Sequence, residues 1–164
     1  MRNYEQMPNN LLIDEHLDID LLVNDYFLVK NILDADSATE YTYDDGGCRI
    51  LNYAYINNSK VLFDFRFIRD NYCDIQFQKD MMASRIPFHN LYIPDKTYHI
   101  FSLIYHAIIH KRAISNTYTS IFISYGIKSE DINKPFLKAV LDPFMKRHNY
   151  RYVKPEPSVG FFIE

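Results

Sequence analysis

The stretch Leu17-Asp18-Ile19-Asp20-Leu21-Leu22-Val23 sets the expected fold, because it places two carboxylates on an otherwise apolar segment. Its length and its apolar residues predict a buried β-strand over 17–23. Side chains alternate between the two faces of a strand, so Asp18 and Asp20 share one face, with Cα atoms roughly 6–7 Å apart. Burying unpaired carboxylates is unfavourable, and a bound divalent cation is one way to offset the penalty. The pattern therefore indicates a metal site on a strand.

A third carboxylate lies on a later segment of similar character, Val61-Leu62-Phe63-Asp64-Phe65. This segment belongs to a predicted hairpin, in which strands over 49–56 and 60–68 flank an Asn-Asn-Ser turn. Arg66 shares the strand face of Asp64, where it either binds a phosphate beside a metal or pairs with an acid. The three aspartates together predict metal-assisted phosphoryl or nucleotidyl transfer. The competing interpretation is a pair of exposed aspartates at a strand end.

The order of these elements resembles the nucleotidyltransferase-fold superfamily: a strand with Asp-x-Asp, a helix, and a hairpin with a third Asp. The resemblance implies a small mixed β-sheet on which Asp18, Asp20 and Asp64 are the catalytic residues and the ligands of Mg²⁺ or Mn²⁺. Asp64 would also receive the proton of the acceptor hydroxyl. The implied activity is transfer of a nucleotidyl group from a nucleoside triphosphate to an acceptor, which is a small molecule, a sugar or a protein.

The segment before Asp18 departs from that superfamily, whose members usually carry a Gly-Ser pair there. The backbone amides of that pair hold the phosphates of the nucleotide. Arg2 and Asn3 lie nearest the corresponding place, where Arg2 would offer a charge to a phosphate and Asn3 a hydrogen-bond donor. The departure leaves a second hypothesis open: a catalytically degenerate member of the fold that binds a nucleotide or a protein partner.

The second half of the chain predicts mainly helices. The segment 87–94 begins and ends with proline and is expected to be a connection. Apolar residues then recur at helical spacing over about 95–111, with Asp95 as a candidate N-cap. A further helix is expected over 129–148.

Histidines on the first of these helices have two interpretations. His106 and His110 lie one turn apart, so they either share a metal or contact a phosphate, or one is buried and hydrogen-bonded while the other caps a surface. We favour the structural interpretation. The segment 98–111, with Ile114-Ser115 and Pro157-Ser158-Val159-Gly160, resembles nucleotidyltransferase-like proteins encoded near surface-polysaccharide genes, which have a Tyr-His…His-Lys helix.

Together these patterns predict an α+β fold with a small mixed sheet of the nucleotidyltransferase type. Residues 1–85 are expected to form the nucleotidyltransferase-like core, with helices over 26–35 and 74–84. Residues 86–164 are expected to form a helical half with a short terminal strand, packed as one unit with the core. The chain is 48% hydrophobic, which allows a sizeable core.

Charge and hydropathy narrow the classes of partner. The net charge of −3 creates no general attraction for nucleic acid, whereas a nucleotide needs only a few local cations and a metal. The apolar run over 100–109 contains His106 and is too short to span a bilayer, so no membrane partner is expected.

Cysteine content and the first residues indicate the compartment. Cys48 and Cys73 have neither metal-ligand spacing nor a disulfide framework, and neither is expected to be a nucleophile. Residues 1–6 are polar and do not form a secretory signal. The expected location is therefore the cytoplasm.

Overall fold

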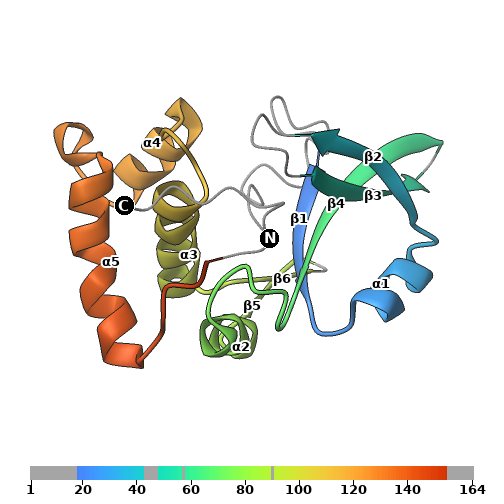
Figure 1. Cartoon of the computed structure of the whole chain (residues 1–164), viewed down its shortest axis with the longest axis horizontal. Coiled ribbons are helices and arrows are strands. Elements are labelled where there is room, and N and C mark those ends of the chain that lie inside the picture. The colour runs from blue at the N-terminus through green and yellow to red at the C-terminus, as the bar shows by residue number, and fades with distance from the viewer. Residues whose placement is uncertain (1–17, 43–47, 57, 90, 155–164) are drawn as a thin grey trace.

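The structure, a computed structural model, describes residues 18–42, 48–56, 58–89 and 91–154. Within these residues the chain forms a four-stranded mixed sheet, a two-stranded sheet and five α-helices (Figure 1). The strands are β1 (Asp18–Val23), β2 (Asp36–Thr42), β3 (Cys48–Ile56), β4 (Ser59–Phe67), β5 (Ile86–Phe88) and β6 (Leu91–Ile93). The α-helices are α1 (Tyr26–Ile32), α2 (Ile75–Ala83), α3 (Lys96–Ile109), α4 (Asn116–Ser124) and α5 (Lys134–His148). The predicted α+β class with a small mixed sheet is confirmed.

The larger sheet has the strand order β1-β4-β3-β2. β1 pairs with β4 in parallel, whereas the β4–β3 and β3–β2 pairs are antiparallel. The predicted β3–β4 hairpin is present, and Ile56 pairs with Ser59 across a two-residue loop. Asn58 in that loop has φ of +63°, a conformation that short hairpin loops require and that asparagine tolerates. This topology places the two predicted aspartate-bearing strands side by side.

One face of the sheet packs against α1 to form a small core. Ile19 and Leu21 of β1 point to this face together with Phe63 and Phe65 of β4, as the alternation of side chains along a strand requires. Asp25 begins α1, and its side chain accepts a hydrogen bond from the Leu28 amide at 2.9 Å. We call this cluster the sheet core.

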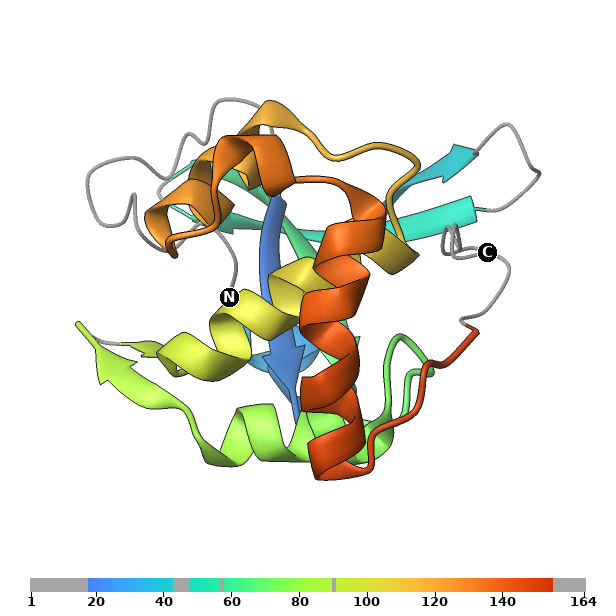
Figure 2. The same cartoon turned by 90° about the vertical axis from the view of Figure 1, so that its left-hand side faces the viewer.

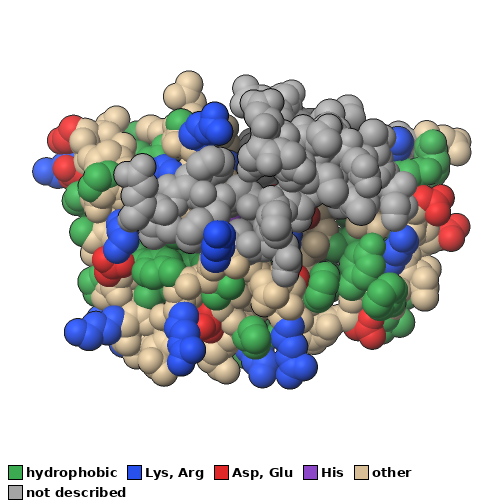
Figure 3. Space-filling view, viewed as in Figure 1, with side chains coloured by type: hydrophobic (Ala, Val, Ile, Leu, Met, Phe, Trp, Pro, Cys, Tyr) green, Lys and Arg blue, Asp and Glu red, His purple; other side chains and the backbone are tan. Residues whose placement is uncertain are grey.

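The outward side of α1 remains apolar. Phe27, Leu28 and Ile32 are 73%, 56% and 71% exposed, respectively. Figure 3 shows green side chains gathered over the position that α1 has in Figure 1. α1 therefore contributes one side to the sheet core and presents apolar side chains at the surface on the other.

The opposite side of the molecule is a second core built on α3. Asp95 caps α3 as predicted, and its side chain accepts from the Tyr98 amide at 2.8 Å. α3 is buried along most of its length, and α5 crosses it in Figure 2. Phe77 of α2 packs in the same cluster as residues of α3 and α5, so this helical core includes residues on both sides of position 85. The division of the chain at that position stays a prediction.

Three local expectations were wrong. α5 begins at Lys134, not near 129, because 129–131 form a short 3₁₀ turn and Asn133 caps the α-helix. α1 ends at Ile32, before Asp34 turns the chain with φ of +48°. The segment 87–94 is not a simple connection, because β5 and β6 pair there as a short hairpin. β2 and α4 were not predicted.

No helix within the described ranges is long and apolar enough to cross a membrane. The expected terminal strand falls within 155–164, outside the described residues.

The loop from β4 to α2 is fixed by Gln78, which is 1% exposed. The Gln78 side chain accepts from the Arg69 amide at 2.9 Å, and donates to the Asp70 carboxylate at 2.6 Å. It also donates to the Phe67 carbonyl at 3.3 Å. Arg69 has φ of +80°, a conformation that is unfavourable for a side chain of this size. These hydrogen bonds therefore hold a strained loop in place.

We predict that Gln78→Leu lowers the free energy of unfolding by about 2–3 kcal/mol, because it leaves the Arg69 amide and the Asp70 carboxylate without this partner. Gln76→Leu is the matched control, since Gln76 is exposed on the same helix and its side chain bonds Asp80. Urea denaturation followed by circular dichroism measures both variants. Equal losses in the two variants would contradict this role of Gln78.

Candidate functional site

Two of the predicted metal ligands lie next to each other in the structure. Asp20 of β1 is in register with Asp64 of the adjacent parallel strand β4. Neighbouring strands lie roughly 4.8 Å apart, and residues in register point to the same face. That face is opposite the sheet core, and Asp64 is 5% exposed on it. Asp18 lies two residues before Asp20, in register with Leu62. We refer to Asp20 and Asp64 as the acidic pair.

Arg66 lies beside the acidic pair. Its guanidinium donates to the Asp64 carboxylate at 3.4 Å and lies 4.3 Å from the ring centre of Tyr72. Of the two expected roles of Arg66, pairing with an acid is therefore present in the structure. The Nε of Arg66 is buried and has no hydrogen-bond partner among the described residues. Arg66 thus keeps one donor for a further group.

Two predicted phosphate-binding residues lie outside the described part of the chain. Arg2 and Asn3 both precede residue 18, the first residue that the structure describes. Their roles remain predictions.

The acidic pair has the donor chemistry of a Mg²⁺ or Mn²⁺ site. Carboxylate oxygens are preferred ligands of these ions, and Mg²⁺ usually keeps several waters and binds substrate phosphates in addition to one or two carboxylates. The residues that the structure describes contain no cluster of three or more His, Cys, Asp and Glu side chains around a common point. If such an ion binds here, Asp20 and Asp64 are the carboxylates that would hold it, together with water and phosphate oxygens.

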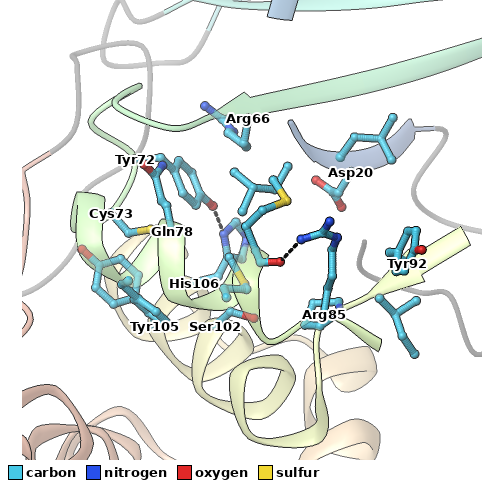
Figure 4. Close-up of a pocket in the computed structure, with 17 residues that line it drawn as sticks. Asp20, Arg66, Tyr72, Cys73, Gln78, Arg85, Tyr92, Ser102, Tyr105 and His106 are labelled. Carbon is cyan, nitrogen blue, oxygen red and sulfur yellow. Dashed lines mark hydrogen bonds between the residues drawn. The ribbon is translucent and has the colours of Figure 1, made fainter. Parts of the chain in front are cut away.

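A pocket of about 310 Å³ opens beside the acidic pair, between the sheet and the helices α2 and α3. Asp20 and Arg66 line it from the sheet, Tyr72 from the loop after β4, and Arg85 and Tyr92 from the β5–β6 region. Figure 4 shows Asp20 and Arg85 pointing into the pocket from opposite sides. The Arg85 guanidinium lies 5.1 Å from the ring centre of Tyr92 and donates to the Met82 carbonyl at 2.6 Å.

Tyr72 connects the sheet side of this pocket to α3. Its hydroxyl is hydrogen-bonded to Nδ1 of His106, and its carbonyl accepts from Nε2 of His110 at 3.2 Å. The rings of Tyr72 and His110 stack with centroids 4.1 Å apart. His106 and His110 are both buried. The buried, hydrogen-bonded state that the structural interpretation expected of one histidine is therefore found for both, and neither lies at a surface.

Cys73 lies in the wall of the pocket with a buried thiol. Burial raises the pKa of its thiol, and the nearby carboxylates of Asp70 and Asp74 raise it further. The thiol is therefore protonated at neutral pH, and a thiol is a weak nucleophile.

The sequence prediction missed Arg85 and Tyr92. Tyr92 belongs to the segment 87–94 that was expected to be a plain connection, and Arg85 lies just before that segment. Strands of three residues give too little alternation to identify. Both residues line the same pocket as Asp20, although they are distant from it in the sequence. The available signal was the pair of short apolar segments around His89.

Comparisons of the chain with protein-family models, with curated proteins and with solved structures found no match. The function is therefore inferred from the residues and the geometry of this chain.

His99 makes the stability of the protein sensitive to acid. Its Nδ1 lies 2.5 Å from the Tyr125 hydroxyl, and burial lowers its pKa to about 4 from the ordinary value of 6.5. Between these two pH values the unfolded chain binds a proton that the folded chain does not. Stability therefore falls as the pH is lowered through this window, by up to about 3 kcal/mol from this residue.

We predict that His99→Gln reduces the loss of unfolding free energy between pH 6.5 and pH 4. Glutamine does not titrate, so the proton uptake of the unfolded chain at this position disappears. Urea denaturation at four pH values across this window measures the slope, and His89→Gln, on an exposed residue, is the control. An unchanged slope in His99→Gln would disprove the assignment.

Proposed function

We propose that the protein is a metal-dependent nucleotidyltransferase that binds Mg²⁺ or Mn²⁺ and a nucleoside triphosphate at the acidic pair. The observation that carries the proposal is the register of Asp20 and Asp64 on adjacent parallel strands, on the sheet face that α1 does not cover. Placing two carboxylates side by side is unfavourable unless a cation neutralises them. The nucleotidyltransferase type of the sheet is part of this proposal.

Each proposed site residue has a role in binding or proton transfer. Asp20, Asp64 and Asp18 are the metal ligands, and the metal ion, when bound, neutralises phosphate charge and orients the triphosphate. Arg2, Asn3 and Arg66 are the phosphate-binding residues in this proposal. Arg66 supports that role with its unsatisfied buried Nε.

In the proposed reaction an acceptor oxygen forms a bond to the α-phosphorus of the triphosphate. The bond from that phosphorus to the bridging oxygen breaks, and pyrophosphate leaves with the bonding electrons. The proton of an acceptor hydroxyl passes to Asp64.

A second candidate function follows from the ion pair of Arg66 with Asp64. The guanidinium already neutralises this carboxylate at 3.4 Å, so Asp64 has a counter-charge without a metal. A protein of this kind would bind a nucleotide or a protein partner without catalysing transfer.

We predict that nucleoside triphosphates stabilise the protein only when Mg²⁺ or Mn²⁺ is present. Asp20→Asn and Asp64→Asn should each weaken Mn²⁺ binding about tenfold or more, because each removes one charged ligand of the ion. Asp36→Asn is the matched control, since Asp36 is exposed on β2 and loses the same charge. Calorimetry with Mn²⁺ and thermal unfolding with the four common nucleoside triphosphates provide the measurements.

The outcomes separate the two candidate functions. Stabilisation by a nucleotide without metal supports the non-catalytic binding module. Unchanged Mn²⁺ affinity in both acidic-pair variants would reject the metal-dependent enzyme.

A further inference from the structure

We infer that the pocket beside the acidic pair binds the acceptor, and that the acceptor is a small organic anion with an apolar, ring-sized body. The word acceptor rests on the proposed function, whereas the binding of such an anion does not. Three properties of the pocket carry the inference: its volume, the chemistry of its walls and the donors that it leaves unused.

The expected acceptor classes were a small molecule, a sugar and a protein. Among them, the volume of the pocket favours a small molecule. About 310 Å³ lies at the small end of the range of roughly 300–1,000 Å³ that ligand pockets occupy. A pocket of this size encloses one compact organic molecule. A folded protein would instead require an extended surface.

The side chains that line the pocket favour a ligand with an apolar body. Met81, Met82 and Phe77 line the pocket from α2, and Ile93 and Pro94 line it from the end of β6. Methionine side chains are flexible and polarisable, and they pack well against rings. These residues would cover both faces of a ring-sized group.

Two polar side chains of the same walls, those of Gln78 and Ser102, are already hydrogen-bonded to the protein. The Gln78 amide uses both its oxygen and its nitrogen to hold the loop after β4. The Ser102 hydroxyl donates to the His99 carbonyl at 2.9 Å. A nucleobase beside Gln78 and Ser102 would lose hydrogen bonds to water without gaining new ones from these two side chains. The walls therefore disfavour the nucleotide base and favour a body without polar edges.

The hydrogen-bond donors of the pocket favour a negatively charged ligand. Arg85 uses one nitrogen for the Met82 carbonyl, and Tyr92 lies against its guanidinium, so the side chain is held in place with further N–H groups available. Arg85 is therefore the cation that the pocket offers to a negative charge.

The location connects the anion with the reaction. Arg85 and Asp20 point into the pocket from opposite sides (Figure 4). An anion held by Arg85 would therefore lie beside the acidic pair, where the triphosphate is proposed to bind. The pocket thus positions an acceptor for transfer.

Calorimetry with the full-length protein tests the inference with defined probes. Phenyl phosphate and phenylacetate present a ring with a phosphate or a carboxylate, and comparing them identifies the preferred anion. 2-Phenylethylamine carries the opposite charge on the same ring. Adenosine 5′-monophosphate tests a polar base in place of the apolar ring. Titrations are made in the absence of nucleoside triphosphate, with and without Mg²⁺.

We predict that at least one of the two ring anions binds saturably with one molecule per chain, and that 2-phenylethylamine binds about tenfold more weakly or not at all. Arg85→Gln should weaken binding of the anion about tenfold, because it removes a charged donor. Arg147→Gln is the matched control, since this exposed arginine of α5 is remote from the pocket lining. Asp20→Asn should strengthen anion binding in the absence of Mg²⁺, because it removes the negative charge from the wall.

Several results would overturn the inference. These are the absence of binding by both ring anions, equal binding of 2-phenylethylamine, tighter binding of adenosine 5′-monophosphate than of phenyl phosphate, or an unchanged affinity in Arg85→Gln. The proposed transfer is rejected separately, by the absence of metal-dependent binding of nucleoside triphosphates. In that case the inference about the pocket is kept if the ring anions still bind. Since Arg85 is exposed, its substitution should leave the thermal unfolding midpoint unchanged. The same measurement serves as the control that the variant is folded.

Discussion

Asp64 is a buried carboxylate on a sheet face, and Arg66 lies against it at 3.4 Å. Arg66 in turn stacks on Tyr72, which is hydrogen-bonded to His106 of α3 and to His110, the residue that caps the C-terminus of α3. This continuous series of polar contacts joins the sheet to the helices. Since a buried carboxylate without a counter-charge would be strongly destabilising, the position of Arg66, and through it of Tyr72, depends on Asp64.

The same constraint divides the sheet into two unlike faces. Ile19, Leu21, Phe63 and Phe65 fill one face and pack against α1. Charged residues on the other face do not allow a second apolar layer of the same kind, so that face contacts the helices through arginine and aromatic rings. The space left between the sheet, α2 and α3 is the pocket. The pocket and the acidic pair thus have a common origin in the placement of aspartates on adjacent strands.

Local patterns predicted the elements that carry the acidic pair. The alternation of side chains predicts β1, the turn residues predict the β3–β4 hairpin, and helical spacing predicts α3 with its cap Asp95. Each of these patterns involves residues that are close together in the sequence. The register of Asp20 with Asp64 also depends on a parallel pairing between distant segments, which local patterns do not determine. Arg85 and Tyr92 were not predicted, because their contribution to the pocket arises from the fold of a hairpin with strands of three residues. The acidic pair and Arg66 were therefore named from the sequence, whereas Arg85, Tyr92 and the pocket were not.

The central claim is that the acidic pair binds a divalent metal ion. Crystals grown with Mn²⁺ and a non-hydrolysable nucleoside triphosphate analogue test it most directly, because an anomalous difference map locates the ion. The account predicts a peak within coordination distance of the carboxylate oxygens of Asp20 and Asp64, with the Arg66 guanidinium turned toward a phosphate. A map without such a peak, with Arg66 still paired to Asp64, would contradict it.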